Sequence, residues 1–277
     1  MRWAGASWLQ DHLDDGMVIL DCQPNLHDFI NAHIPGAVYA DELVLRVSRG
    51  GRPAQYLPER AMGEVLGSLG VRNDWPVLVY GGTGSLRKGG DGAEQAMWAY
   101  SLLRFGHDDV ILLDGGLDGW LAQALPVTKA FNEIGVASFR TTLRDGCNIT
   151  MDEVQGMIGN DDCVLVDVRN PVLYSTQAHW PRPGHIPGAI SMHWHRLMDP
   201  EDVRRLRPLD ETMAVLQDAG ISPEKEVVLY CGSGREAAGP YLVLKHLLHY
   251  PDVRVYEGSF TEWASYPDNR TVNGHEP

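Results

Sequence analysis

An internal repeat constrains this sequence more than any other feature. The segment His-Ile-Pro-Gly-Ala at residues 33–37 recurs unchanged at residues 185–189, which is 152 positions later. Each copy lies downstream of an apolar run that ends in aspartate, at Asp21 and at Asp167. Chance is a poor explanation for five identical residues in matching surroundings. The chain is therefore predicted to contain one kind of domain twice.

Further pairs of segments follow in the same order in both halves. Residues 78–80 correspond to 228–230, and Trp120 corresponds to Trp263. A length of 277 residues also suits two domains better than one. Between the halves lie glycine, asparagine and charged residues without an apolar period. We predict a first domain at residues 1–128, a linker at 129–147 and a second domain at 148–277.

Short apolar runs of strand length recur in both halves, for example at residues 77–80, 110–113 and 226–230. They lack a clean alternation of apolar and polar residues, as expected for strands covered on both faces. Helical patterns lie between them, for example at residues 96–103 and 241–248. Strands that alternate with helices predict an α/β fold, in which each half forms a parallel sheet with helices on both faces.

The charge balance argues against partners that carry many phosphates. Lysine and arginine number 23 against 37 aspartate and glutamate residues, which gives a net charge of -14. Such a field repels nucleic acids and anionic lipids, so we predict that neither nucleic acid nor membrane is a partner. The start of the chain lacks the apolar run of a signal peptide, and no stretch has the roughly 18 apolar residues that span a bilayer. These features predict a cytoplasmic protein.

The cysteines are few and far apart. Cys22, Cys147, Cys163 and Cys231 form no CxxC pair, which fits neither a disulfide framework nor a zinc site. Each is expected to be a free thiol. A histidine pair at residues 193 and 195 has no third ligand at a spacing typical of a metal site. We therefore predict no metal and no other cofactor.

One strand-to-helix turn carries a pattern with chemical meaning. The apolar run at residues 226–230 leads directly into Cys231 and the loop Cys-Gly-Ser-Gly-Arg-Glu-Ala, and a helix is predicted to follow to about Tyr250. Ligands of parallel sheets bind at such turns, beyond the carboxyl ends of the strands. Gly232 and Gly234 allow the backbone to curl so that several N–H groups face one centre, where they can hold an anion.

A thiol at this centre is expected to ionise easily. The inward N–H groups, the positive end of the following helix and Arg235 should each lower the pKa of Cys231 and so supply the reactive thiolate. The same donors would stabilise a persulfide anion on Cys231. The local pattern alone equally allows Cys231 to be an ordinary buried cysteine beside a glycine-rich turn.

Several motifs together resemble the tandem-domain rhodaneses, the family of thiosulfate and 3-mercaptopyruvate sulfurtransferases. They are the paired His-Ile-Pro-Gly-Ala segments, Val-Asp-Val-Arg at residues 166–169, the Cys231 loop, and Glu-Gly-Ser-Phe-x-Glu-Trp at residues 257–263. The resemblance covers nearly the whole chain. It implies two rhodanese-like domains, of which only the second is catalytic, and a persulfide on Cys231. In the first half Gly81 stands in place of the nucleophile, and residues 41–57 are expected to contribute to one wall of the active-site cleft.

By the same resemblance, the substrate is a small anionic sulfur donor and the acceptor is cyanide or a thiol. A charged loop favours thiosulfate, because a dianion gains from a fixed guanidinium. The alternative donor is 3-mercaptopyruvate, whose enzymes share Cys-Gly-Ser-Gly but tend to use two arginines ahead of the second repeat, and Leu173 stands where one is expected. The role of Glu236, the physiological acceptor and the oligomeric state are left open. The predicted substrate-binding residues are Gly232, Ser233, Gly234, Arg235, Glu236, Ala237 and Arg182.

Other conspicuous residues are assigned structural roles. His33 and His185 occur in both halves, including the half without a nucleophile, so they are expected to bond backbone groups at a turn. Trp120 and Trp263 are expected to pack in the two cores. Arg169 is expected to form an ion pair with the aspartate at the end of the preceding strand.

Two other classes of function compete with a sulfurtransferase. Protein and arsenate phosphatases place an arginine after the five residues that follow their cysteine, whereas Ala237 stands there in this chain. A rhodanese-like domain can also act as a non-catalytic binding module. The presence of Cys231 in a glycine-containing loop argues against that alternative, while Glu236 could reduce the reactivity of the thiol.

Overall fold

The computed structural model describes residues 1–86, 89–176 and 179–277 and divides into two compact units. Unit 1 comprises Met1–Val47, Tyr56–Arg144 and Glu201–Leu206. Unit 2 comprises Ser48–Gln55, Asp145–Pro200 and Arg207–Pro277. Each unit therefore contains one short segment from the other half of the sequence. The two exchanged segments are equivalent in the repeat, because Arg52 and Arg204 differ by the same 152 positions as the two His-Ile-Pro-Gly-Ala copies.

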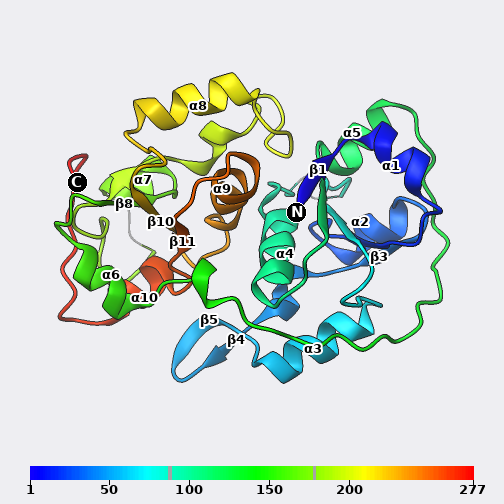
Figure 1. Ribbon diagram of the computed structural model, residues 1–277, viewed down its shortest axis with the longest axis horizontal. Coiled ribbons are helices and arrows are strands. Elements are labelled where there is room, and N and C mark those ends of the chain that lie inside the picture. The colour runs from blue at the N-terminus through cyan, green and yellow to red at the C-terminus, as the bar shows by residue number, and fades with distance from the viewer. Residues whose placement is uncertain (87–88, 177–178) are drawn as a thin grey trace. The chain divides into compact units, whose positions relative to one another are not determined.

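Unit 1 is built on a five-stranded parallel sheet (Figure 1). The central strands are buried along their whole length, as the continuous apolar runs predicted. The spatial order is β1 (Arg2–Ala4), β7 (Val110–Leu113), β6 (Val77–Tyr80), β2 (Val18–Asp21) and β3 (Ala37–Tyr39).

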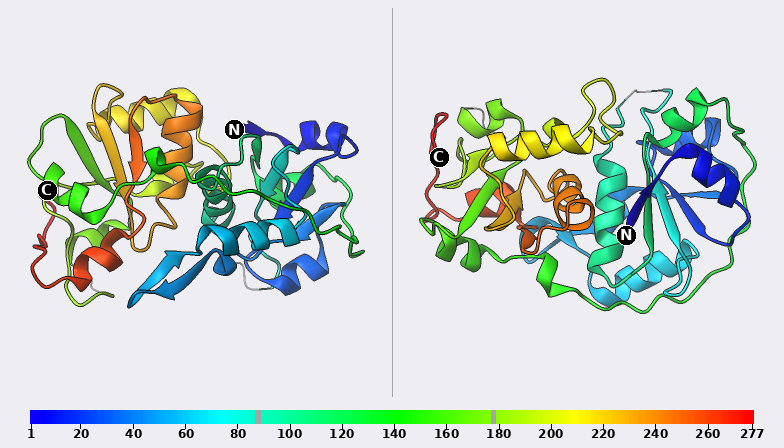
Figure 2. Two further views of the ribbon diagram at one scale, coloured as in Figure 1. Left: turned by 60° about the horizontal axis from the view of Figure 1, so that its bottom comes forward. Right: turned by 45° about the horizontal axis from the view of Figure 1, so that its top comes forward.

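Helices cover both faces of this sheet (Figure 2). On one face, α1 (Ala6–His12), α2 (Leu26–Asn31) and α5 (Gly116–Ala122) supply side chains to a core that includes Trp120. On the other face, α4 (Ala93–Arg104) packs on β6 and β7. The remaining elements of the first half are α3 (Glu59–Ser68), the 3-10 helix Glu42–Leu45 and the two-stranded sheet of β4 (Arg46–Arg49) and β5 (Arg52–Tyr56).

Unit 2 repeats this plan with a four-stranded parallel sheet in the order β11 (Val253–Val255), β10 (Glu226–Tyr230), β8 (Cys163–Asp167) and β9 (Ile190–Ser191). The predicted α/β class with two similar parallel sheets is confirmed. The α-helices of unit 2 are α6 (Met151–Met157), α7 (Pro171–Ser175), α8 (Leu209–Asp218), α9 (Ala238–Leu242) and α10 (Ser259–Ser265). Unit 2 also contains 3-10 helices at Asp145–Cys147 and Trp194–Leu197 and a π-helix at Val243–Leu247.

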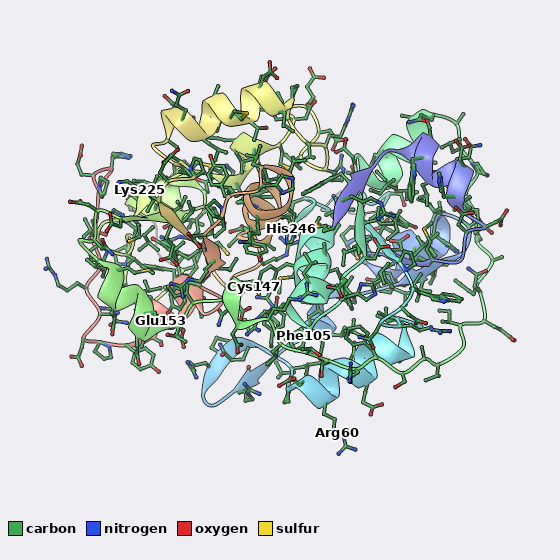
Figure 3. All side chains as sticks on the ribbon, viewed as in Figure 1. Arg60, Phe105, Cys147, Glu153, Lys225 and His246 are labelled. Atoms are coloured by element: carbon green, nitrogen blue, oxygen red, sulfur yellow. The ribbon has the colours of Figure 1, made fainter. Side chains whose placement is uncertain are left out.

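Local sequence signals explain where several of these helices begin and end. Thr150 and Glu153 form a reciprocal capping box at the start of α6. Figure 3 labels Glu153 on this helix. The helix predicted to run to about Tyr250 is shorter than expected, because α9 passes into the π-helix, which ends at Leu247. Among the described helices, none has the length and apolar character needed to cross a lipid bilayer.

The two histidines and two tryptophans that were expected to have structural roles are buried and bonded to backbone groups. His33 Nδ1 lies 2.8 Å from the carbonyl oxygen of Phe29, and His185 Nδ1 lies 3.0 Å from that of Tyr174. Both rings are fully buried. The indoles of Trp120 and Trp263 are buried too, and each donates its N–H to a nearby carbonyl, at 2.8 and 2.9 Å. These paired contacts hold the same turns together in the two halves.

The segment that we predicted as a linker, residues 129–147, runs along unit 1 as far as Arg144. Ala137 donates its N–H to the carbonyl of Gly67 at 2.9 Å. A Cβ on Gly67 would lie 2.4 Å from the Ala137 carbonyl oxygen, so glycine is required for this close approach. The first unit thus includes most of the segment that joins the halves.

Candidate active site

The Cys231 loop lies at the carboxyl edge of the unit 2 sheet. Cys231 follows β10 directly, and the loop ends where α9 begins at Ala238. The Cys231 side chain is buried, with 1% exposure, while Ser233, Arg235 and Glu236 are half-buried. A buried sulfur at the rim of a parallel sheet, beside partly exposed polar side chains, has the placement expected of a nucleophile.

Backbone N–H groups face the sulfur, as the sequence predicted. Gly234 donates its N–H to Cys231 Sγ at 3.1 Å, and the amides of Ser233, Glu236 and Ala237 also favour the thiolate. Gly234 has φ of +83°, and a Cβ there would lie 2.8 Å from the carbonyl oxygen of Glu257. Only glycine fits this position without strain. We call these N–H groups the amide cradle.

The expected lowering of the thiol pKa is wrong. Burial raises the pKa of Cys231 above its ordinary value, and the Glu236 carboxylate raises it further. The amide cradle acts in the opposite direction but is the smaller effect. The sequence indicated the inward amides correctly, but it gave no measure of how completely the sulfur would be removed from water.

This balance predicts how sulfur loading depends on pH. Because the thiolate is the nucleophile and the pKa of Cys231 is raised, the loading rate should increase about tenfold per pH unit below that pKa. Glu236→Gln removes the like charge, so the thiolate should form at lower pH and loading at pH 7 should become several-fold faster. Stopped-flow rates between pH 6 and 9 measure this shift. Glu224→Gln, an exposed change at the opposite end of β10, is the control and should leave the profile unchanged.

The start of α10 holds the backbone of the loop. Phe260 donates its N–H to the Cys231 carbonyl at 3.1 Å, and Thr261 donates to the Gly232 carbonyl at 2.9 Å. The Cys231 N–H in turn donates to Ser259 Oγ at 3.1 Å. The Glu-Gly-Ser-Phe-x-Glu-Trp motif therefore holds the backbone of the Cys231 loop in place through hydrogen bonds. The sequence alone did not indicate this role for the motif.

Trp180 packs against the Cys231 loop, and the sequence did not indicate this role either. Its Nε1 donates to Thr261 Oγ1 at 2.8 Å, and a Cβ on Gly232 would lie 3.0 Å from its ring. The ring also meets Phe260 edge to face at 5.2 Å. Trp180 has no counterpart among the repeated motifs, so the sequence pattern did not mark it. Its position favours glycine at residue 232, because any Cβ there would be in tight contact with the ring.

Arg169 is an ion-pair partner, as predicted. Its Nε donates to Asp167 Oδ1 at 2.9 Å, and the two side chains are 1% and 0% exposed. The guanidinium lies 4.1 Å from the centre of the Phe260 ring and 5.0 Å from that of Trp180. The pair therefore lies in the core directly beneath the residues that support the loop.

Arg182, predicted to bind substrate, does not join the loop residues. Its guanidinium donates to carbonyl groups at the carboxyl end of α10, including Ala264 at 3.1 Å and Tyr266 at 2.6 Å. Carbonyl groups at the end of a helix lack the N–H groups of a following turn, so a fixed cation there completes the helix end. The described hydrogen bonds of Arg182 thus give it a structural role. The sequence could not reveal it, because α10 lies about 80 residues further on.

The equivalent loop of unit 1 begins with glycine instead of cysteine and is bonded differently. Gly81 stands in place of Cys231, and its N–H donates to Gln95 Oε1 at 2.7 Å. The N–H of Thr83 donates to Asp118 Oδ2 at 2.8 Å. Arg204, from the exchanged segment, pairs with Asp118 at 3.2 Å. Two backbone N–H groups of this loop therefore already donate to side-chain oxygens of the protein, those of Gln95 and Asp118.

The counterpart segment in unit 2 is Ser48–Gln55, which lies within residues 41–57, the part of the first half predicted to contribute to the catalytic half. Arg52 donates to Glu262 in α10. A cavity of about 380 Å³ beside this pair is lined by Arg52, Gln55, Asn148, Glu257 and Tyr266, among others. The second unit thus includes one segment from the first half of the sequence, residues 48–55.

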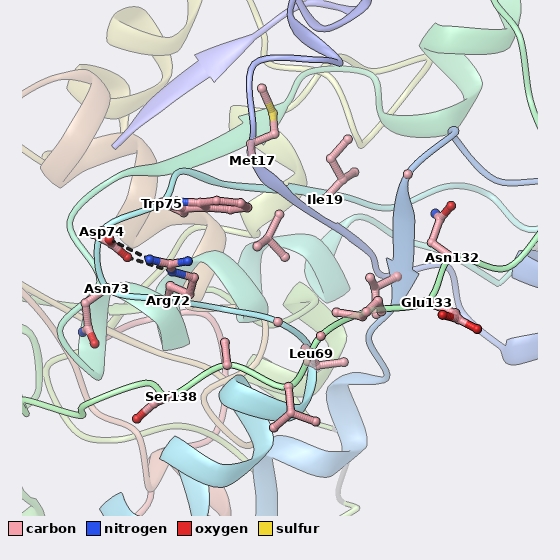
Figure 4. A pocket seen from close by; sticks show the side chains of 18 residues that line it. Met17, Ile19, Leu69, Arg72, Asn73, Asp74, Trp75, Asn132, Glu133 and Ser138 are labelled. Carbon is pink, nitrogen blue, oxygen red and sulfur yellow. Dashed lines mark hydrogen bonds and ion pairs between the residues drawn. The ribbon is translucent and has the colours of Figure 1, made fainter.

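In the part of the chain that the structure describes, the histidine pair at residues 193 and 195 belongs to no metal-binding group. The His193 and His195 rings lie 4.4 Å apart, but within residues 1–86, 89–176 and 179–277 no three histidine, cysteine or acidic side chains form a group that could hold a metal ion. A larger cavity, of about 680 Å³, lies in unit 1 (Figure 4). Arg72 lies against Trp75 there, 4.8 Å from its ring centre, and pairs with Asp74. This cavity contains no part of the Cys231 loop.

Comparison with known proteins gives matches over both halves. The sequence profile of the Rhodanese-like domain matches residues 5–123 and 150–266. The thiosulfate sulfurtransferase of Pseudomonas aeruginosa is 35% identical, over 87% of this chain and 85% of that protein. The 3-mercaptopyruvate sulfurtransferase of Escherichia coli is 29% identical, over 96% of each. The crystal structure of Escherichia coli SseA, reported as the rhodanese fold of 3-mercaptopyruvate sulfotransferases, matches with a TM-score of 0.82 and 26% identity, over 93% of this chain and 98% of that one.

Proposed function

The chain belongs to the rhodanese-like family and is a sulfurtransferase, and on that premise we propose that it transfers a sulfane sulfur from thiosulfate to cyanide or a thiol through a persulfide on Cys231. One observation carries the proposal. The sulfur of Cys231 lies in the amide cradle, 3.1 Å from the Gly234 nitrogen, at the carboxyl edge of the sheet. An anion formed on that sulfur would meet donors that are already in place.

The proposed reaction is a pair of displacements at sulfur. The Cys231 thiolate attacks the outer sulfur of thiosulfate, an S–S bond to Cys231 forms, and sulfite leaves with the electron pair of the bond that breaks. The acceptor, for example cyanide, then attacks the terminal persulfide sulfur and leaves as thiocyanate, which restores the thiolate. Ser233 and Arg235, which are half-buried in the loop, would contact the donor anion. The covalent intermediate predicts ping-pong kinetics.

Two features favour thiosulfate over 3-mercaptopyruvate as the donor. Arg235 places a guanidinium charge within the loop, which suits a dianion. The two arginines expected for a mercaptopyruvate carboxylate are not offered to the loop, since Leu173 replaces one and Arg182 is bonded to the carbonyls of α10. We also propose that the enzyme acts in the cytoplasm, where its four cysteines, all free, would stay reduced.

The proposal is tested with purified protein and two donors. Incubation with thiosulfate should add one sulfur atom to Cys231, detected by mass spectrometry of the intact chain and of its peptides. Thiocyanate formation in the presence of cyanide should be faster with thiosulfate than with 3-mercaptopyruvate at equal concentration. Faster turnover with 3-mercaptopyruvate would reverse the choice of donor. A chain that neither donor modifies would instead indicate a non-catalytic binding module.

A further inference from the structure

Ser259, the first residue of α10, has an unusual backbone conformation. Its φ is 52°, in the left-handed region that residues with a Cβ rarely occupy, and the residue is fully buried. A buried serine gains nothing from solvent that would offset this strain. Such strain persists only where the surroundings impose it and tends to accompany function.

The repeat provides an internal reference for this position. Trp120 and Trp263 correspond, so Ser259 corresponds to Gly116, the first residue of α5. Gly116 also has φ of 52°. The half without a nucleophile therefore adopts the same turn with glycine, the residue that tolerates it. The half with the nucleophile keeps a serine, which implies that its hydroxyl group does something that glycine cannot do.

The hydroxyl group binds the nucleophile's own backbone. Ser259 Oγ accepts the N–H of Cys231 at 3.1 Å and donates to the Tyr256 carbonyl at 2.8 Å. In the first half the corresponding N–H, that of Gly81, is bonded by Gln95 from α4 instead. The Cys231 carbonyl is held by the Phe260 N–H. Both polar backbone groups of Cys231 are thus fixed by the first two residues of α10.

We propose that Ser259 is a positioning residue for sulfur transfer: its hydroxyl group fixes the Cys231 backbone so that Sγ stays in the amide cradle. This inference rests on the proposed function of Cys231 and extends it to a residue that touches neither donor nor acceptor. A shift of the Cys231 backbone would move Sγ away from the Gly234 N–H, which lies only 3.1 Å away. Misplacement of a reacting atom by about 1 Å is enough to slow a reaction about a hundredfold.

Two substitutions separate positioning from stability. Ser259→Gly removes both the hydroxyl group and the backbone strain, whereas Ser259→Ala removes the hydroxyl group and keeps the strain. If Ser259 positions the nucleophile, both variants should load sulfur from thiosulfate about tenfold to a hundredfold more slowly. Their thermal stabilities should nevertheless differ, with the glycine variant the more stable. If Ser259 only stabilised the fold, the variant with the higher thermal stability would also load sulfur faster.

Ala124→Gly is the matched control. Ala124 also has a left-handed φ, 54°, but it is exposed and lies beyond α5 in unit 1. This change should relieve strain of the same kind and leave sulfur loading at the wild-type rate.

A second measurement does not depend on sulfur transfer. The rate at which iodoacetamide alkylates Cys231 reports its thiolate, and its pH profile should move to higher pH in both Ser259 variants, because fewer amides would face Sγ. A Ser259→Gly enzyme with wild-type loading and a wild-type alkylation profile would overturn the proposal. If the wild-type chain takes up no sulfur, the proposed function fails, and the alkylation profile alone then decides the role of Ser259.

Discussion

Replacing Cys231 with serine is expected to reduce thiosulfate-dependent thiocyanate formation by about a thousandfold or more. The alcohol of serine is far less acidic than a thiol, and its oxygen cannot carry a transferable sulfur. The change should alter the fold little, because serine is similar in size and can still accept the Gly234 N–H that cysteine accepts at 3.1 Å. Turnover is measured with saturating thiosulfate and cyanide, and intact mass after thiosulfate treatment should show no added sulfur.

The control for this variant is Cys163→Ser. Cys163 is half-buried on β8 and is another free thiol of unit 2. It should retain wild-type turnover and take up one sulfur atom on Cys231. Should Cys231→Ser keep a tenth or more of the wild-type turnover, the nucleophile has been wrongly assigned.

The second large effect concerns stability. Arg169→Met is expected to lower the free energy of unfolding by about 3 to 5 kcal/mol, because it leaves the fully buried Asp167 carboxylate without its cation. Urea-induced unfolding at pH 7 measures the loss. A loss below about 1 kcal/mol would mean that the pair contributes little to holding the site together.

The repeat supplies a matched variant, Arg169→Gln. The first half already has this arrangement, since Gln23 donates to Asp21 at 2.9 Å, and burial raises the pKa of Asp21 to about 6. Arg169→Gln should therefore cost less than Arg169→Met. A raised carboxyl pKa means that the folded chain binds a proton which the unfolded chain releases. The destabilisation should consequently shrink as the pH falls from 7 through about 6 toward the ordinary aspartate value. Equal losses for both variants at every pH would contradict this explanation.

The fold could be predicted from the sequence because the signals for it are local and occur twice. Apolar runs such as residues 77–80 and 226–230 predicted buried strands, and the His-Ile-Pro-Gly-Ala repeat predicted their arrangement in two similar sheets. The Cys231 loop could be predicted equally well, because the strand, the cysteine and the glycines follow one another directly in the sequence. The inward amide of Gly234 follows from those neighbours alone.

The features that could not be predicted depend on contacts between distant segments. The pKa of Cys231 follows from how deeply the loop is buried, and the role of Arg182 follows from the carbonyls of α10, far along the chain. The support given by Ser259 required its left-handed φ to be seen beside that of Gly116. The exchange of residues 48–55 and 201–206 leaves no mark in the local pattern, because a loop of the same composition can pack against either half.

That exchange bears on whether either half of the sequence could be expressed by itself. Arg52 of the first half pairs with Glu262 in α10, the helix that supports the Cys231 loop, and Arg204 of the second half pairs with Asp118 beside the loop that has Gly81 in place of the cysteine. Each unit thus contains an arginine that is encoded in the other half of the sequence. A second half expressed alone would therefore lack Arg52, which belongs to the unit that contains Cys231, and a first half expressed alone would lack Arg204.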